Sequence, residues 1–296
     1  MRGCWFFVPA ARRSRLRAFL FARKRMSDMV EWQRIAFVDS RKRQARESQR
    51  QAIAAPATIG VLGIIVAWQL LVWIGDYPTF ILPEPAAVFR KFAETITNGL
   101  LWRHLRLTLL EVLLGFALGF SSATALGYYL AHHRRAEHMI TPYLVAMQAV
   151  PVVAIAPLLV IWFGFGLLSK VLICALIVFF PVLINTIVGV RSVRREWLDM
   201  MHVWHASRWE TFRLVEVPAA LPVLFGGLKL GVTLAVVGAV VGEFVGAREG
   251  LGALINIARG GLYDTTLLFV ALFTLVAMAL ALYGSVVWLE QRVRWW

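Results

Sequence analysis

Apolar runs of more than 20 residues recur along this 296-residue chain, and they limit its possible folds more than any other feature. An apolar stretch of about 18 or more residues with few charges is typical of a helix that crosses a membrane. Of the residues, 59% are hydrophobic and 16% are charged, whereas soluble proteins average about 25% charged residues. The sequence therefore predicts an all-α polytopic membrane protein. Its spans, about six in number, are expected at residues 53–74, 107–131, 139–164, 167–190, 219–246 and 266–290.

Positive charge is distributed unevenly among the segments outside these spans. Residues 1–52 hold fourteen Lys and Arg against four acids, and further basic residues gather in 132–138, in 191–218 and in the tail 291–296. The positive-inside rule places such segments, and with them both termini, in the cytoplasm. We expect a disordered basic arm at 1–52, a transmembrane domain at 53–290 and a cytoplasmic tail. No nucleic-acid recognition motif accompanies the net charge of +14, so no nucleic-acid partner is expected.

Residues suited to metal binding or catalysis are few. The two cysteines, Cys4 and Cys174, lie far apart and form no CxxC, which argues against a disulfide framework or a zinc site. His132, His133 and His138 could hint at a metal site, but a solvated cytoplasmic turn is the better interpretation. The chain also lacks Gly-x-Ser-x-Gly, His-Glu-x-x-His and close carboxylate pairs. We therefore expect neither a metal site nor an enzyme.

Small residues repeat in the fifth predicted span. Gly238, Gly242 and Gly246 are spaced as GxxxGxxxG, and small residues four apart let two helices approach backbone to backbone. We expect a helix packing contact within one chain. The alternative is a subunit or pore interface.

Two acids fall inside predicted spans, where an acid is costly and usually faces a cavity or a partner. Glu243 is expected either to pair with Arg248 or Arg259, or to act in gating near the outer mouth. Glu111 is expected to extend to the membrane interface, and the alternative is that it lines the pathway. Two further polar residues, which either line the pathway or hydrogen-bond to a neighbouring helix, are Gln148 and Asn185.

The segment between the fourth and fifth spans, WLDMMHVWHASRWETFRLVEVPAALP (197–222), is charged, aromatic and patterned. Trp197, Met200, Met201 and Trp204 recur at i, i+3, i+4 and i+7, which predicts an amphipathic helix. A membrane protein that needed only a turn between two spans would not require such a pattern.

A second short helix is expected to follow. Ser207 and Glu210 form the S-x-x-E pattern of a capping box. Pro218 is expected to end this helix, because proline lacks a donor and clashes with the preceding turn. Pro222 is expected to open the next span. The two helices form either an interfacial hairpin with tryptophans in the headgroups or a knob that docks in the groove of a partner.

The order of residues in this segment resembles the loop motif of ATP-binding-cassette importer permeases. That motif is Glu-Ala-Ala, three residues, Gly, nine residues, Ile, one residue and Leu-Pro. Here residues 199–201 (Asp-Met-Met) stand for Glu-Ala-Ala, His205 for Gly, Val215 for Ile, and residues 217–218 (Val-Pro) for Leu-Pro. Further stretches similar to the permeases for nitrate, sulfonates, taurine and pyrimidine-type vitamin precursors are ILPEPAAVF (81–89), MQAVPVVAIAPLLVIWFGFG (147–166) and VGAVVGEFVGAREGLGALI (237–255).

The resemblance implies that residues 191–218 form a cytoplasmic loop of coupling helices, which dock in a cleft of a separate ATPase subunit. The residues to which it gives this role are Glu196, Trp197, Asp199, Met200, Met201, Trp204, His205, Ala206, Ser207, Arg208, Trp209, Glu210, Phe212 and Pro218. His205 departs from the motif glycine, but histidine is among the non-glycine residues enriched at positive φ. Met200 and Met201 are bulkier than the two alanines of the motif, which implies that the partner ATPase has a groove of matching shape.

The same resemblance implies the partners. They are two ATPase subunits that bind ATP and Mg, an extracytoplasmic solute-binding protein and a second copy of this chain, in the inner membrane of a bacterium. The chain has no G-x-x-x-x-G-K-[ST], so it lacks a P-loop of its own, and no cofactor is expected in it. The implied solute is small and polar or anionic: nitrate, a sulfonate, taurine, or a vitamin or pyrimidine precursor. The alternatives are an ion-coupled secondary carrier, which predicts paired buried charges, and an intramembrane enzyme.

Overall fold

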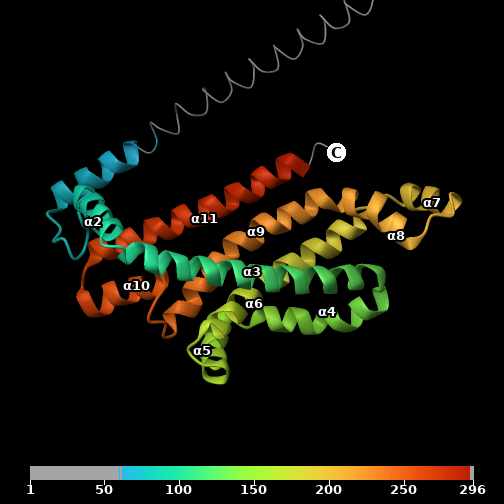
Figure 1. The fold of residues 1–296 in the computed structure, drawn as a ribbon, viewed down its shortest axis with the longest axis horizontal. Helices are drawn as coiled ribbons and strands as arrows, with labels where there is room; N and C mark the ends of the chain where they lie inside the picture. Colours follow the sequence, from blue (N-terminus) through green and yellow to red (C-terminus); the bar gives the residue numbers. More distant parts are fainter. Residues whose placement is uncertain (1–59, 61, 294–296) are drawn as a thin grey trace, which may run out of the picture. The chain divides into compact units, whose positions relative to one another are not determined.

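The computed structural model describes residues 60 and 62–293, and within them every regular element is helical, which confirms the all-α prediction (Figure 1). The chain divides into two compact units, Met1–Leu71 and Val72–Trp296. The first described helix, Leu62–Gly75, is apolar but shorter than a span. The basic arm predicted at 1–52 lies outside the described residues. The elements discussed below belong to the second unit.

Among the described residues, four helical segments are long and apolar enough to cross a membrane. They are α3 (Leu100–His132), α6 (Leu167–Arg191), the continuous segment Arg208–Phe244 that ends in α9 (Val217–Phe244), and α11 (Thr265–Val293). A fifth span results if α4 (Arg134–Ala149) and α5 (Val152–Phe163) are counted together. The prediction of a multi-span membrane protein is confirmed, whereas the count of six spans stays a prediction.

The third predicted span, 139–164, is broken. Its two helices, α4 and α5, meet at 91°. Pro151 lies at the break and lacks a backbone donor. A residue before proline is driven out of the helical region, and Val150 indeed has φ −82° and ψ 120°. The two helices therefore change direction at this point.

The core of the second unit forms where α6 packs against both α3 and α9. A Cβ atom on Gly238 of α9 would lie 2.7 Å from the Cα atom of Cys174 on α6, and one on Gly242 would lie 3.3 Å from the Cα atom of Lys170. These two glycines thus let two helices of the same chain approach backbone to backbone. Gly246 lies beyond the end of α9, where its φ is +130°, and so is not part of this helix contact.

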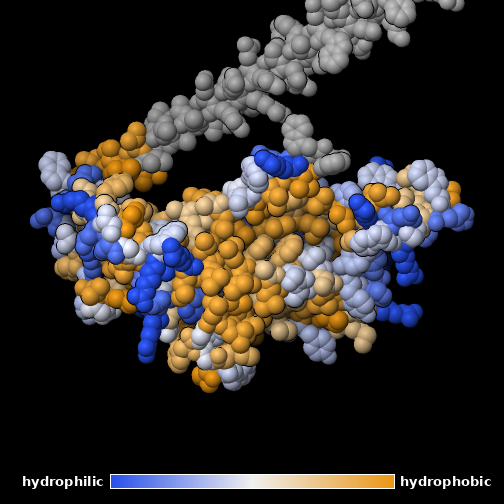
Figure 2. Space-filling model, viewed as in Figure 1, coloured by the Kyte–Doolittle hydropathy of each residue, from blue (hydrophilic) through white to orange (hydrophobic). Residues whose placement is uncertain are grey.

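Shorter helices lie near the two ends of the long ones (Figure 1). They are α2 (Pro85–Thr97), α10 (Leu251–Ile257) and the π-helix η2 (Ala258–Leu262) near one end, and α7 (Arg195–Val203), α8 (Arg208–Thr211) and the π-helix η1 (Phe212–Glu216) near the other. Figure 2 shows hydrophobic residues over the middle of the long helices and hydrophilic residues gathered around α7 and α8. This distribution matches a bundle with an apolar middle and polar ends.

Candidate functional site

The segment between α6 and α9 forms two short helices, α7 and α8, joined by a tight turn. His205 lies in this turn with φ +52°, so the expectation of positive φ at this position is confirmed. The turn closes through backbone bonds from His205 N to His202 O (3.0 Å) and from Ala206 N to Met201 O (3.0 Å). Histidine therefore occupies here a conformation that glycine adopts without strain.

The capping box predicted at Ser207 is present at the start of α8. The hydroxyl Oγ of Ser207 accepts from the backbone N–H of Glu210 (3.2 Å), and Oε2 of Glu210 accepts from the backbone N–H of Ser207 (2.7 Å). Each side chain thus satisfies a backbone donor that the helix leaves free. The geometry of the turn is thereby fixed on its α8 side.

Pro218 does not end the second helix, so that prediction is wrong. The helical run is continuous from Arg208 to Phe244, and Pro218 lies in the first turn of α9 while Pro222 lies inside it. The turn before Pro218 is the π-helix η1, in which Val217 N bonds to Phe212 O. A π-turn has i→i+5 bonds in place of i→i+4 bonds. The helical run continues through Pro218, although proline itself donates no backbone hydrogen bond.

The apolar residues of the two short helices face different surroundings. Met201 is buried with Val193 and Val215 in a small core of the segment itself, whereas Trp204 and Trp209 are 70% and 66% exposed. Among the other residues named for coupling, Ala206 and Phe212 are half-buried, and those that are exposed are Glu196, Trp197, Asp199, Met200, His205, Ser207, Arg208, Glu210 and Pro218. The structure therefore presents three tryptophans, Trp197, Trp204 and Trp209, on an exposed element where a partner can reach them.

A polar and aromatic contact joins this segment to α3. The hydroxyl of Tyr128 donates to Oε2 of Glu216 (2.9 Å), and Nε2 of His132 lies 3.1 Å from Oε1 of the same carboxylate. The ring of Phe212 packs edge-on against Tyr128 (5.3 Å between centroids) and stacks on Trp209 (5.4 Å). Sequence reasoning missed this contact, because nothing in the local pattern pairs residues more than 80 positions apart.

The residues named for a pathway lie in different places. Gln148 lines a cavity of about 580 Å³ between α4 and α6, together with Thr141 and Arg191. Asn185 instead donates to the carbonyl of Pro181 (2.8 Å) and packs against Gly227 of α9. Helix contact therefore accounts for Asn185, while Gln148 faces a space that a solute could enter.

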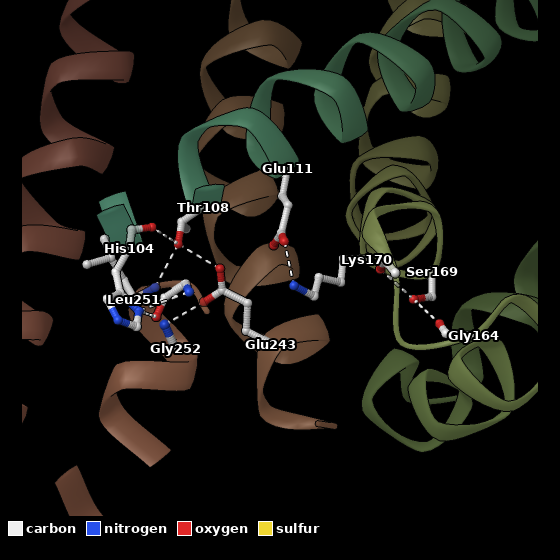
Figure 3. Close-up of polar contacts among 11 residues, drawn as sticks. His104, Thr108, Glu111, Gly164, Ser169, Lys170, Glu243, Leu251 and Gly252 are labelled. Atoms are coloured by element: carbon white, nitrogen blue, oxygen red, sulfur yellow. Dashed lines mark hydrogen bonds and ion pairs between the residues drawn. The ribbon is translucent and has the colours of Figure 1, made fainter. Parts of the chain in front are cut away.

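Glu243, the third of these residues, is fully buried near the other end of the long helices (Figure 3). Its Oε1 accepts from the hydroxyl of Thr108 (2.6 Å), and its Oε2 accepts from the backbone N–H of Gly252 (2.5 Å). Neither Arg248 nor Arg259 forms an ion pair with it within the part of the chain that the structure describes. The expected arginine pairing is therefore wrong.

Glu111 is also fully buried and does not extend to the membrane interface, so that prediction is wrong as well. Its Oε1 accepts from Nζ of Lys170 at 2.7 Å. Lys170, near the start of the predicted span 167–190, lies in the first turn of α6 and is buried. A buried charge is retained where an opposite charge compensates it, and this pairing across 59 residues leaves no local signal in the sequence.

Metal-binding residues do not gather in the described part of the chain. Within residues 60 and 62–293, no group of three or more His, Cys, Asp or Glu side chains is placed to hold a metal ion. His132 contacts Glu216, and Nδ1 of His133 lies 2.9 Å from the carbonyl of Tyr129. The polar groups of the two histidines thus serve local contacts.

The chain is similar to known transport proteins of the bacterial inner membrane. Residues 115–295 match the family model described as binding-protein-dependent transport system inner membrane component. The chain is 51% identical over 259 residues to the riboflavin transport system permease protein RibX of Chloroflexus aurantiacus, covering 87% of this chain and 96% of that protein. It is 31% identical to the formylaminopyrimidine transport permease protein ThiX of Halalkalibacterium halodurans, covering 69% and 81% of the two chains.

A solved structure shares the fold. A chain of the MetNI methionine ABC transporter in an inward-facing conformation superimposes with a TM-score of 0.54 at 18% identity, covering 65% of this chain and 94% of that one. At this identity the likeness concerns the fold alone.

Proposed function

Because the chain belongs to the family of inner membrane components of binding-protein-dependent transport systems, we propose that residues 195–216 couple its translocation pathway to a separate ATPase subunit. The chain is a multi-pass permease subunit of an ABC importer, and this class works with an ATPase and a solute-binding protein. In the proposed assembly two copies of the chain form one pathway. Two ATPase subunits bind ATP and Mg, and both termini face the cytoplasm.

The observation that carries the coupling proposal is the surface of the α7–α8 segment. Its exposed tryptophans, Trp204 and Trp209, stand on an element that is held in shape by the capping box and by the small core around Met201. A preformed apolar knob loses little conformational freedom on docking, so more of the contact energy appears as affinity. Such a surface suits the groove of an ATPase.

Two connections lead from this surface into the membrane. One is the unbroken helical run Arg208–Phe244, which joins α8 to α9. The other is the contact of Phe212 and Glu216 with Tyr128 on α3. A displacement of α8 would therefore act on α9 along the helix axis and on α3 through this contact.

For the solute, we propose a nitrogen-heterocyclic vitamin or vitamin precursor, with riboflavin as the first compound to test. The support is the 51% identity over 87% of the chain to a riboflavin permease, together with the likeness to a formylaminopyrimidine permease. Gln148, which lines the cavity of about 580 Å³ between α4 and α6, offers an amide to such a ring system.

The alternative is an ion-coupled secondary carrier. That class predicts paired buried charges, and Lys170 with Glu111 is such a pair. The family match nevertheless favours the importer. Dependence of transport on an ATPase separates the two functions.

The test is reconstitution of the chain in proteoliposomes with candidate ATPases and solute-binding proteins from the same genome, followed by native mass determination and uptake of labelled riboflavin. The coupling variant is Trp209→Ala with Glu210→Ala. Its matched control is Trp102→Ala, which removes another exposed tryptophan from the opposite end of α3. We expect ATP-dependent uptake, and loss of both the ATPase complex and uptake in the coupling variant alone. Uptake by the chain without any ATPase would support the secondary carrier instead.

A further inference from the structure

Three charged side chains from three different helices meet in the interior of the bundle. Glu111 comes from α3, Lys170 from α6 and Glu243 from α9, and they converge in Figure 3. Glu111 and Glu243 are 0% exposed and Lys170 is 6% exposed. None of the roles assigned to coupling or to the pathway accounts for this cluster.

Glu243 is held closely on all sides. Besides Thr108 and Gly252, its carboxyl group has Gly250 against it, where a Cβ atom would overlap the carboxyl oxygens. Gly250 has φ +121°, a conformation that favours glycine. The loop after α9 is thus built to enclose this carboxyl group, which shields it from water.

One oxygen of the cluster has no partner. Oε2 of Glu111 is buried and receives no hydrogen bond among the described residues, because Lys170 donates to Oε1. An ionised carboxylate accepts hydrogen bonds but donates none. If Glu111 were ionised, this oxygen would carry buried negative charge without a donor.

Charge balance requires a proton in the cluster. Two carboxylates and one ammonium group would leave one uncompensated negative charge in a buried site within membrane-spanning helices. Burying an unpaired charge is costly, and such groups neutralise instead. One proton makes the cluster neutral.

We propose that Glu111 and Glu243 together bind one proton, while Lys170 stays charged as the counter-charge of the remaining carboxylate. The bound ligand is the proton itself, and the site joins α3, α6 and α9. This inference goes beyond the proposed function and does not depend on the solute or on the ATPase.

Other titratable or charged groups near the cluster do not replace this proton. Nδ1 of His104 is engaged by Gly250, with its backbone N–H at 3.1 Å and its carbonyl at 2.8 Å. Cys174 is a buried free thiol on α6. Arg248 and Glu249 line a cavity of about 550 Å³ together with Glu111 and Lys170. Arg248 is exposed to solvent, and Glu249 bonds to Arg103.

Infrared spectroscopy of the full chain in nanodiscs tests the proposal directly, because a protonated carboxylic acid has a C=O stretching band that a carboxylate lacks. We expect this band in the wild type at neutral pH. We expect its loss in Glu111→Gln and also in Glu243→Gln, since either change leaves one carboxylate against Lys170. A wild type without the band, or a band of unchanged area in Glu111→Gln, would overturn the proposal.

Thermal unfolding of the same variants provides a second measurement. Glu111→Gln keeps an acceptor for Lys170 and leaves Glu243 as the counter-charge of Lys170, so its midpoint is expected close to that of the wild type. The double variant Glu111→Gln, Glu243→Gln leaves Lys170 without a counter-charge and is expected to unfold at a lower temperature than either single variant. At high pH the wild type should lose the infrared band and stability together, while Glu111→Gln should not show this loss. A double variant as stable as the two single variants contradicts the charge balance.

Discussion

Replacement of Gly238 by alanine tests the backbone contact between α6 and α9. The new Cβ atom would lie 2.7 Å from the Cα atom of Cys174, closer than the 3.0 Å below which Cβ contacts essentially never occur, so the helices must move apart by a few tenths of an ångström. The obstructing atom belongs to the backbone and cannot rotate away. Overpacking of this kind costs about 1–3 kcal/mol, against a gain of about 1 kcal/mol from replacing a helical glycine by alanine.

Gly226 supplies the matched control, because it lies in the same helix and a Cβ atom there would have nothing within 4 Å. Gly226→Ala should show only the gain in helix propensity, so the two variants should differ by about 1–3 kcal/mol in free energy of unfolding. This corresponds to a difference of about 2–12 °C in melting midpoint for a chain of this size. Thermal unfolding of both purified variants in one detergent, at one scan rate, measures it. Equal midpoints, or a higher midpoint for Gly238→Ala, would refute the close-contact argument.

Three further predictions concern polar contacts outside the helix core. Tyr128→Phe removes the donor to Glu216, a hydrogen bond to a charged group worth about 1.5–3 kcal/mol. Binding of the ATPase should persist in this variant while the solute moved per ATP falls, and an unchanged ratio would exclude the contact from coupling. Ser207→Ala removes the cap of α8 at a cost of about 1 kcal/mol. Titration with the ATPase should then show about fivefold weaker binding, and unchanged affinity would refute a role for the cap. The guanidinium of Arg103 holds the pKa of Glu249 below its ordinary value. Because this pKa is lowered in the folded chain, the contact stabilises the loop above the ordinary glutamate pKa of about 4.3 and is lost as the pH falls below it. Hydrogen exchange of the loop should therefore differ between wild type and Glu249→Gln at pH 7 and converge in acid, and a difference that persists in acid contradicts the assignment.

Features with a local cause were predictable from the sequence. The capping box at Ser207 follows from two residues three positions apart, and the positive φ of His205 follows from its place in the family motif. The long apolar helices are likewise set by runs of consecutive residues. In each case the residues that determine the feature are neighbours in the chain.

Features that depend on pairing between distant segments were missed. The ion pair of Lys170 with Glu111 was not predicted, because the neighbours of Lys170 in the sequence show no sign of Glu111, which lies 59 positions earlier. The partners of Glu243 are a hydroxyl and a backbone N–H, and neither carries a sign in the charge pattern. Pro218 was misjudged because the rule for proline assumes α-helical bonding, whereas the preceding turn is a π-helix.

The continuous helical run Arg208–Phe244 connects the two regions that this structure singles out. It has 37 residues, which at 1.5 Å per residue span about 55 Å, and it begins at α8 and carries Glu243 in its last turn. Along α6 the contact is made by Gly238 and Gly242, which have no side chains to interlock. The same helix end also packs Val241 and Val245 against the core around Ile173. The bonds of Glu243 to Thr108 and Gly252 add polar contacts to α3 and to the start of α10. A stroke that shifts α8 along the helix axis would therefore act on the charged cluster at the far end of the same helix.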